Sequence, residues 1–319
     1  MNTQKEIPVF FSVDDEYAPF LATALASATK NCSPDRQYKA IVLHQDLSNE
    51  NKSRLSRLAL DNFKIEFVQM QKGLEAITDR LSNRLRFDCF TLTIYFRLFI
   101  PTMFPQYDKG IYIDCDVVVL GDLAKMFDTH LQGKLIGACA DKSVVDVPPL
   151  CEYMENVVGV NRYDYINSGV LLMDLKALRE KEFDRHFLNL LNTYHFDSVA
   201  PDQDYINAIC NGNILYLDDG WNTMPNENKP PVVSPKLIHY NLYSKPWCYD
   251  NVQYADIFWQ YSKESGYYND ALNYKENYSK ENGENALYKL GVLISRSREI
   301  CQNDTTLRAV AEKGVKIKL

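Results

Sequence analysis

The sequence predicts an α/β protein with a Rossmann-like, doubly wound sheet. Strand-like and helix-like segments alternate from the first residues onward. The expected strands are continuous apolar and β-branched runs, which are typical of parallel strands buried on both faces. A chain of 319 residues with 46% hydrophobic side chains is also long enough to bury a large core. We therefore expect one large domain with an appendage.

The first part of the chain predicts a βαβαβ unit. A strand is expected over residues 7–13, and the helix-like segment 17–30 follows it. A second strand over 40–44 precedes a helix that Ser48 can cap and that runs to about residue 60, and a third strand covers 65–70. Such alternation is the pattern of a doubly wound sheet.

Further elements follow with less regular spacing. The segment 91–104 has an apolar helical face with one charge, Arg97, in its middle, and 110–119 is a strand that two acids interrupt. A helix is expected over 201–210, with acids in its first turn and Gly212 just past its end. More strands are expected over 135–140, 169–173, 214–217 and 236–240.

Composition excludes several classes of protein. The net charge is −7, the pI is about 5.4, and no dense Lys/Arg stripe is present, so we expect no nucleic-acid partner. The eight cysteines are scattered without a CxxC motif and predict reduced thiols in a cytoplasmic protein. The apolar segment 18–28 follows acids where a signal peptide needs positive charge, and no run approaches the roughly 18 apolar residues of a membrane span.

The most informative motif is Asp114-Cys115-Asp116, which follows the apolar strand residues 111–113. Side chains at i and i+2 of a strand end point to the same side, so both carboxylates can converge on one point. Mg²⁺ or Mn²⁺ suits this arrangement, because such ions use one or two protein carboxylates and complete their shell with substrate phosphates and water. The alternative is that one acid is an ordinary turn residue.

A second group of residues follows the strand expected at 236–240. His239 is a borderline ligand that suits Mn²⁺ or Zn²⁺, and Lys245 could neutralise a diphosphate. Alone, His239 is more typical of a structural histidine and Trp247 of a core residue. Together with the distant Asp114 and Asp116, they suggest a clamp for a metal ion and a diphosphate.

Several motifs in one order make the chain resemble the family 8 retaining glycosyltransferases, which include glycogenin and the bacterial lipopolysaccharide α-galactosyltransferases. The resemblance covers roughly residues 7–250 and implies a GT-A type, mixed-sheet fold. The motifs are Ser12-Val13-Asp14-Asp15, Tyr95-Phe96-Arg97-Leu98, Asp114-Cys115-Asp116, Gly137-Ala138-Cys139-Ala140-Asp141, Asn167-Ser168-Gly169-Val170-Leu171-Leu172, Asp202-Gln203-Asp204, and His239 with Lys245-Pro246-Trp247.

The resemblance also implies a function and a role for each residue. The enzyme would transfer a hexose, glucose or galactose, from a UDP-sugar to a carbohydrate or glycolipid acceptor with retained configuration. Asp114, Asp116 and His239 would hold Mn²⁺, with Mg²⁺ as the alternative ion, and Lys245 would hold the phosphates. Ser12, Val13, Asp14 and Cys115 would contact the nucleoside; Arg97, Asp141, Asn167, Ser168, Asp202 and Gln203 would surround the sugar, with Gln203 and Asp202 as the catalytic pair.

The chain departs from the family pattern at two positions. Glu16 stands where the family often has Asn, and Leu242 stands where the His-x-x-Gly-x-x-Lys-Pro-Trp stretch has its glycine. Glycine there would let the backbone approach phosphate closely. We therefore expect a rearranged loop around Leu242.

Other interpretations remain open. A haloacid-dehalogenase-like phosphatase also has a DxD motif after a strand, and a nucleotide-sugar-binding protein can retain this fold without activity. Arg97 could pair with a carboxylate only to fix its helix. Asp202 and Asp204 could serve only the helix dipole, and Asn167-Ser168-Gly169 could be a plain turn.

The composition changes after Trp247, so we expect a catalytic domain over 1–260 and a helical tail over 261–319. Leu287, Leu290 and Ile294 share a helical face, which usually packs on its own domain. The tail also carries Lys289, Arg296 and Arg298, which leaves peripheral membrane contact open. Because every motif precedes the tail, we expect removal of the residues beyond about 287 to leave donor chemistry intact.

Overall fold

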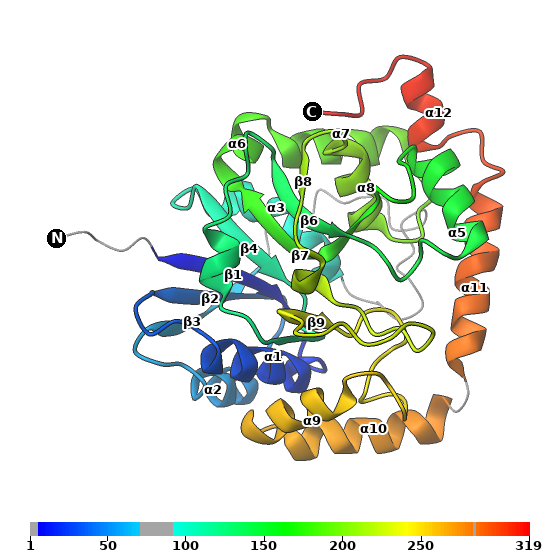
Figure 1. Ribbon diagram of the computed structural model, residues 1–319. Coiled ribbons are helices and arrows are strands. Elements are labelled where there is room, and N and C mark those ends of the chain that lie inside the picture. The colour runs from blue at the N-terminus through cyan, green and yellow to red at the C-terminus, as the bar shows by residue number, and fades with distance from the viewer. Residues whose placement is uncertain (1–5, 71–91, 283–284) are drawn as a thin grey trace.

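The computed structural model describes residues 6–70, 92–282 and 285–319, and Figure 1 shows the arrangement of its elements. Residue 91, the first of the segment 91–104, and Cys89, one of the eight cysteines, lie outside these ranges. The strands are β1 (Ile7–Ser12), β2 (Tyr38–His44), β3 (Phe63–Gln69), β4 (Lys109–Ile113), β5 (Val117–Val119), β6 (Ile136–Ala140), β7 (Ile166–Asp174), β8 (Ile214–Tyr216) and β9 (Leu237–His239).

Helices surround the strands. They are α1 (Ala18–Lys30), α2 (Asn49–Ser56), α3 (Phe96–Met103), α4 (Leu123–Phe127), α5 (Pro148–Tyr153), α6 (Leu175–Glu180), α7 (Phe183–Tyr194), α8 (Pro201–Ile209), α9 (Ala255–Glu264), α10 (Tyr268–Asn282), α11 (Asn285–Ile300) and α12 (Leu307–Glu312), with short turns η2 (Leu92–Tyr95), η3 (Met154–Val158) and η4 (Asp219–Asn222). Ser48 caps α2 as predicted, since its hydroxyl accepts a hydrogen bond from the Asn51 N–H.

The main sheet is mixed and has seven strands in the order β3-β2-β1-β4-β7-β6-β8. Strands β3, β2, β1 and β4 are parallel, β7 runs antiparallel to both of its neighbours, and β8 is parallel to β6. The strand order reverses between β1 and β4. In such sheets the carboxyl ends of the strands flanking the reversal border the ligand crevice. The predicted mixed, Rossmann-like sheet is confirmed.

The sheet is buried on both faces, as the apolar runs predicted. Side chains of β1 alternate: Phe10 belongs to the hydrophobic cluster that includes α3, α6 and α7, whereas Val9 and Phe11 belong to the cluster that includes α1 and α4. All three side chains are fully buried. The two helical layers therefore hold the central strands rigidly and fix the loops at their carboxyl ends.

The segment 110–119 differs from the single strand that the sequence predicts. The chain leaves the main sheet after Ile113, and β5 pairs antiparallel with β9 in a separate two-stranded sheet. The acids Asp114 and Asp116 occupy the bend between the two sheets. Burying two carboxylates within a continuous strand would cost free energy, whereas the bend directs them into a cavity.

The C-terminal helices wrap around one side of the domain (Figure 1). Helices α9 and α10 pack on α1, α11 lies along α5, and α12 reaches η3. Helix α9 extends across residue 260, and the division into a catalytic domain and a tail stays a prediction. Leu290 and Ile294 of α11 are half-buried, in line with a helix that packs on its own domain.

The final residues of the chain belong to the main hydrophobic core. Leu307, Val310 and Ile317 are buried in the cluster that contains α3, α7 and β7. The backbone N–H of Leu319 donates a hydrogen bond to the Ile209 carbonyl at 3.0 Å. The expectation that removal of the residues beyond about 287 leaves donor chemistry intact stays a prediction.

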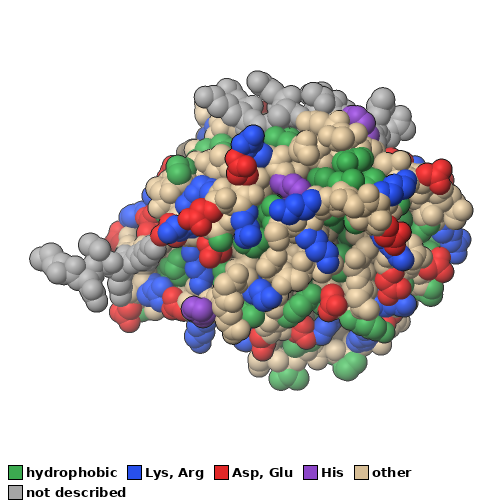
Figure 2. Space-filling view, turned by 90° about the horizontal axis from the view of Figure 1, so that it is seen from above, with side chains coloured by type: hydrophobic (Ala, Val, Ile, Leu, Met, Phe, Trp, Pro, Cys, Tyr) green, Lys and Arg blue, Asp and Glu red, His purple; other side chains and the backbone are tan. Residues whose placement is uncertain are grey.

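The surface carries mixed charge. On the face shown in Figure 2, Lys and Arg side chains are interspersed with Asp and Glu side chains. Among the described residues, no helix is both long and apolar enough to cross a membrane. The described cysteines are free thiols, and Cys115, Cys139, Cys151, Cys210 and Cys248 are buried.

Candidate active site

A cavity of about 660 Å³ lies at the carboxyl edge of the sheet, beside the reversal between β1 and β4. Its wall includes the ends of β1 and β4 with the start of β7, the start of α8 with the loop after β9, residues of α3 and α5, and the helices α10 and α11. All of the residues predicted to act in the site line this cavity: Ser12, Val13, Asp14, Arg97, Asp114, Cys115, Asp116, Asp141, Asn167, Ser168, Asp202, Gln203, His239 and Lys245.

The small sheet brings His239 to the paired acids. In the β5–β9 pair, His239 lies opposite Val117, the residue that follows Asp116. The N–H of Tyr240 donates to the Asp116 carbonyl at 2.9 Å, which extends this pairing to the acid itself. A residue more than a hundred positions away in the sequence is thereby held beside the DxD motif.

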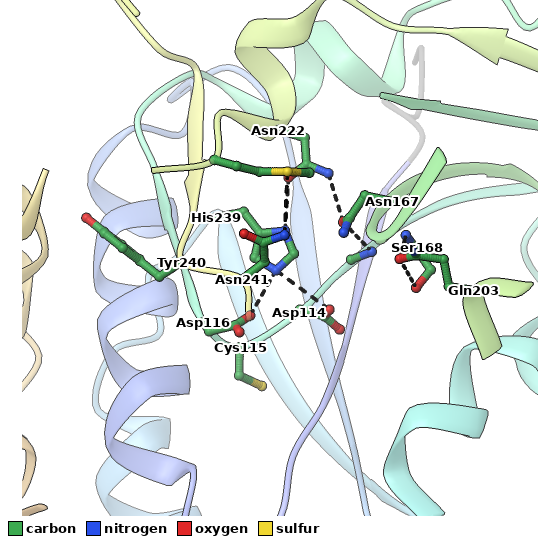
Figure 3. A network of polar contacts seen from close by, with 12 residues as sticks. Asp114, Cys115, Asp116, Asn167, Ser168, Gln203, Asn222, His239, Tyr240 and Asn241 are labelled. Atoms are coloured by element: carbon green, nitrogen blue, oxygen red, sulfur yellow. Dashed lines mark hydrogen bonds and ion pairs between the residues drawn. The ribbon is translucent and has the colours of Figure 1, made fainter. Parts of the chain in front are cut away.

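Three potential metal ligands converge at this point (Figure 3). Nε2 of His239 lies 3.2 Å from Oδ1 of Asp116 and 3.9 Å from Oδ2 of Asp114. The candidate ligand atoms of the three residues all lie within 4.8 Å of one another. Oδ1 of Asp116 is buried and meets no hydrogen-bond donor of suitable geometry within residues 6–70, 92–282 and 285–319. Buried carboxylate oxygens normally have a partner, so this atom is open to a cation.

A chain of amides fixes the orientation of the His239 ring. The Gly169 N–H donates to Oδ1 of Asn167 at 3.0 Å, and that oxygen also accepts from Nδ2 of Asn222 at 3.0 Å. Oδ1 of Asn222 then lies 2.9 Å from Nδ1 of His239. Since an amide oxygen only accepts, Nδ1 carries the proton. The lone pair of neutral His239 at Nε2 therefore points toward the two carboxylates, as a metal ligand requires.

Arg97 links the candidate metal ligand Asp114 to Asp202 at the start of α8. Its Nη2 donates to Oδ1 of Asp114 at 2.8 Å, its Nη1 donates to the Ser168 carbonyl at 2.7 Å, and its Nε lies 3.2 Å from Oδ2 of Asp202. Burial lowers the pKa of Arg97, but the carboxylates of Asp114 and Asp202 raise it by more, so the guanidinium stays charged. The expected pairing with a carboxylate is present, and it links two site residues rather than only fixing a helix.

Asp202 and Gln203 at the start of α8 contact the first residues of β7. Oδ2 of Asp202 accepts from the Ser168 hydroxyl at 2.9 Å. Oε1 of Gln203 accepts from the Ser168 N–H at 3.0 Å, and Nε2 of Gln203 donates to Oδ2 of Asp141 at 3.0 Å. Asn167 donates to the same Asp141 oxygen at 3.1 Å. Five predicted site residues thus form one polar network around the cavity.

Two buried residues behind this network were not predicted as site residues. Asp204 is fully buried and accepts hydrogen bonds from the hydroxyls of Tyr153 and Tyr165, both at 2.6 Å. Asn207 accepts from the Ile166 N–H at 2.7 Å and donates to the Ile166 carbonyl at 2.9 Å. Both hold α8 against β7. The sequence motif Asp202-Gln203-Asp204 contains the first residue, but nothing in the sequence signals the role of Asn207.

Lys245 contacts the other face of Asp116. Its Nζ forms an ion pair with Oδ2 of Asp116 and donates to the Tyr240 carbonyl at 3.0 Å. Burial raises the pKa of Asp116, but the Lys245 ammonium group outweighs this effect, so the pKa of the carboxyl lies well below its ordinary value. The turn that contains Lys245 also contains Trp247, whose ring stacks on that of Phe20 with centroids 4.2 Å apart.

The nucleoside residues predicted at the end of β1 lie next to Cys115. The Cys115 thiol donates to the Ser12 carbonyl at 3.0 Å, and Oδ1 of Asp14 accepts from the Tyr17 N–H at 3.0 Å. Burial raises the pKa of Asp14. The departure Glu16 is exposed at the cavity edge. These contacts hold the end of β1 beside the DxD bend, and Oγ of Ser12 is buried without a hydrogen-bond partner among the described residues.

Leu242 adopts a φ of 51°, the left-handed conformation that favours glycine. The backbone of this loop therefore has a glycine-type conformation although a leucine occupies it. The expected rearrangement of the loop relative to the family stays a prediction. Its side chain lines the cavity.

Sequence comparison assigns the chain to a family. The profile described as Glycosyl transferase family 8 matches residues 8–251. The chain belongs to glycosyltransferase family 8. The predicted enzyme class is thereby confirmed, the Asp114, Asp116 and His239 cluster accords with a metal-dependent member, and a haloacid-dehalogenase-like phosphatase is excluded.

Relatives of this family 8 chain include two curated bacterial proteins. The lipopolysaccharide 1,2-glucosyltransferase of Escherichia coli K12 is 27% identical over 279 residues, which cover 81% of this chain and 78% of that protein. General stress protein A of Bacillus subtilis is 25% identical over 270 residues, which cover 77% of this chain and 89% of that protein.

Solved structures confirm the GT-A type fold of this family 8 member. The galactosyltransferase LgtC, solved with donor and acceptor sugar analogs, matches with a TM-score of 0.67 and 24% identity over 81% of this chain and 96% of that chain. The bifunctional glycosyltransferase WbbM matches with a TM-score of 0.71 and 23% identity over 86% of this chain. The match covers 52% of WbbM, so this chain spans about half of its length.

Proposed function

We propose that this family 8 member transfers a hexose, glucose or galactose, from a UDP-sugar to a carbohydrate or glycolipid acceptor. Mn²⁺ is the proposed cofactor, and the configuration at the anomeric carbon is retained. The names of two similar proteins support a sugar acceptor: a lipopolysaccharide 1,2-glucosyltransferase and the galactosyltransferase LgtC. We keep the cytoplasm as the proposed location, because the described thiols are free.

The observation that carries this proposal is the buried Oδ1 of Asp116, which lies beside Nε2 of His239 and has no hydrogen-bond partner in the part of the chain that the structure describes. Carboxylates of Asp114 and Asp116 with one imidazole form an oxygen-rich set with one nitrogen, which suits Mn²⁺ better than Mg²⁺, because Mg²⁺ prefers oxygen ligands alone. When bound, Mn²⁺ supplies charge stabilisation to a departing diphosphate. The donor set of this chain therefore fits the proposed cofactor.

The remaining cavity residues have proposed roles toward the donor. Lys245, which lies on the far side of Asp116, would neutralise the diphosphate, and the end of β1 with Cys115 would contact the nucleoside. The polar network around the start of α8 would bind sugar hydroxyls through its members Arg97, Asp141, Asn167, Ser168, Asp202 and Gln203. We propose residues 1–260 as the catalytic domain, with helices from the tail completing the cavity wall.

Retention requires either a front-face reaction or a nucleophile from the protein. In retaining hydrolases that nucleophile is a carboxylate. Asp202 lies 3.2 Å from the Arg97 guanidinium and accepts from Ser168, while the Gln203 oxygen accepts from a backbone N–H. These contacts engage Oδ2 of Asp202 and the Gln203 oxygen, and an amide oxygen is in addition a poor nucleophile. We therefore favour a front-face route in which Gln203 and Asp202 stabilise positive charge on the sugar ring and the donor phosphate accepts the acceptor's proton.

A donor screen tests this function. Thermal unfolding with Mn²⁺ should show a higher Tm with UDP-glucose or UDP-galactose than with GDP-, ADP- or CMP-sugars, because a ligand that binds the native state stabilises it. The preferred donor should also release UDP slowly to water without an acceptor. Binding without any UDP release would favour a non-catalytic binding protein, and no response to any UDP-sugar would contradict the proposal.

A further inference from the structure

Helices α10 and α11 contribute part of the cavity wall, although every predicted donor residue precedes them. Five residues of these two helices line the cavity. Tyr274, Asn277 and Tyr278 come from α10, and Lys289 and Leu293 come from α11. Tyr249, from the loop after β9, lines the cavity beside them.

A polar cluster joins these three elements, and we refer to Tyr249, Tyr278 and Lys289 as the tail cluster. Nζ of Lys289 donates to the Tyr278 hydroxyl at 3.1 Å and lies 5.2 Å from the centre of that ring. The Tyr278 hydroxyl lies 2.8 Å from the Tyr249 hydroxyl. The rings of Tyr249 and Tyr278 pack edge to face with centroids 5.6 Å apart. These contacts hold the ammonium group at the cavity wall.

The tail cluster is attached to the turn that carries Lys245. The N–H of Tyr249 donates to the Lys245 carbonyl at 3.0 Å, so the two residues belong to one turn. On α10, Tyr274 packs edge to face on Phe20 with centroids 5.1 Å apart, and Phe20 stacks on Trp247 of the same turn. Lys289 is therefore placed relative to the proposed diphosphate clamp by packed aromatic rings.

Lys289 differs from the other cations of the cavity. Arg97 pairs with Asp114 and Asp202, and Lys245 pairs with Asp116. Among the residues that the structure describes, Lys289 contacts Tyr278 but forms no ion pair with a carboxylate. A half-buried ammonium group beside a cavity, with protons still available for donation, attracts an anionic oxygen of a ligand.

We propose that Lys289, oriented by Tyr278 and Tyr249, forms a second anion-binding site in the cavity wall for a phosphate or carboxylate oxygen. This inference rests on the proposed function, in that the cavity is taken to bind a nucleoside diphosphate donor. Two groups can supply the anionic oxygen that Lys289 binds: the diphosphate of the donor, or an anionic group on the acceptor. An ammonium group is a point charge that recognises either one.

The test compares phosphate-bearing ligands with neutral ones. Isothermal titration in Mn²⁺ measures UDP and uridine on the free enzyme, and then glucose 1-phosphate and methyl glucoside on the UDP-loaded enzyme. The variant is Lys289→Met, with Lys289→Arg as the charge-retaining variant. Lys263→Met is the matched control, because Lys263 is an exposed tail lysine 5.5 Å from the ring of Tyr268 and does not line the cavity.

We expect Lys289→Met to weaken binding of one phosphate-bearing ligand about tenfold, as loss of a charge-assisted hydrogen bond does. Uridine and methyl glucoside should bind as in the wild type, Lys289→Arg should retain most of the affinity, and Lys263→Met should change nothing. The loss should shrink at high ionic strength. Weaker UDP binding assigns the site to the donor, whereas weaker glucose 1-phosphate binding alone assigns it to a second, anionic ligand.

Affinities of Lys289→Met within about twofold of the wild type for both phosphate-bearing ligands would overturn the inference. That result differs from a failure of the proposed function, in which the wild-type enzyme itself would not bind UDP. Thermal unfolding of each variant checks that the native fold is retained.

Discussion

A Cβ atom on Gly169 would lie 2.3 Å from Cε1 of His239, closer than any real Cβ contact. It would also lie 2.6 Å from Oδ2 of Asp114. The absent side chain at this one position of β7 therefore makes room for two of the three candidate metal ligands. The third ligand, Asp116, reaches the same point through the β5–β9 pairing.

Replacement of Gly169 by alanine should separate these ligands. We expect Gly169→Ala to weaken Mn²⁺ binding at least tenfold and to reduce metal-dependent UDP release, because the methyl group displaces His239 or Asp114. Titration of the protein with Mn²⁺ measures the effect. Gly291→Ala is the control, since its Cβ meets no atom within 4 Å in α11, and it should raise stability slightly. Unchanged Mn²⁺ affinity in Gly169→Ala would place the metal elsewhere.

Removal of the Asp204 carboxylate should destabilise the protein. Asp204→Ala leaves the buried hydroxyls of Tyr153 and Tyr165 without their acceptor, and we expect the free energy of unfolding to fall by about 3 kcal/mol. Urea unfolding measures this change. Asp204→Asn retains one acceptor oxygen and should lose less. A loss below about 1 kcal/mol in Asp204→Ala would show that the hydroxyls find other acceptors.

Substitution of Arg97 by lysine should impair catalysis more than folding. Lysine keeps the charge but cannot contact Asp114, Ser168 and Asp202 at the same time. We expect UDP release to fall at least tenfold, which corresponds to about 1.4 kcal/mol. Arg179→Lys serves as the control, because Arg179 donates to the carbonyls of Pro101 and Tyr107 and does not line the cavity. UDP release at the wild-type rate in Arg97→Lys would show that Arg97 serves only as a structural ion pair.

The final helix should contribute to global stability. Leu307 is buried in the main core, so Leu307→Ala should lower the free energy of unfolding by about 2–4 kcal/mol. The exposed Lys313 on the same segment offers Lys313→Ala as a near-neutral comparison. Thermal unfolding measures this change, and we expect Leu307→Ala to unfold in one cooperative transition at a lower Tm than the wild type. A separate early transition that leaves UDP binding intact would instead show an independent tail.

The sequence predicted the elements whose patterns are local. The apolar runs of β1 and β2 and the cap at Ser48 identify their elements because burial on both faces and capping are decided by neighbouring residues. It did not predict that residues 110–119 divide between two sheets. Strand β5 has three residues, and its partner β9 lies more than a hundred positions later, so only the tertiary fold determines this pairing.

In the candidate site, too, some residues could be predicted from local patterns and others depend on the tertiary fold. The DxD acids and His239 could be proposed from their residue types, and the family resemblance named the residues around them. Asn222, which orients His239, is one amide in a short turn and carries no distinguishing pattern. Likewise, no sequence pattern indicates that Lys289 lines the cavity, because its position depends on how α10 and α11 pack.

The central claim is that a divalent cation at Asp114, Asp116 and His239 joins a UDP-sugar to this cavity. Isothermal titration of UDP into the wild type and into Asp116→Asn, with Mn²⁺ and then with chelator, tests it most directly. The account predicts that wild-type affinity falls at least tenfold in chelator and returns with Mn²⁺, while Asp116→Asn binds weakly in both conditions. Equal UDP affinity of the wild type with Mn²⁺ and with chelator would contradict it.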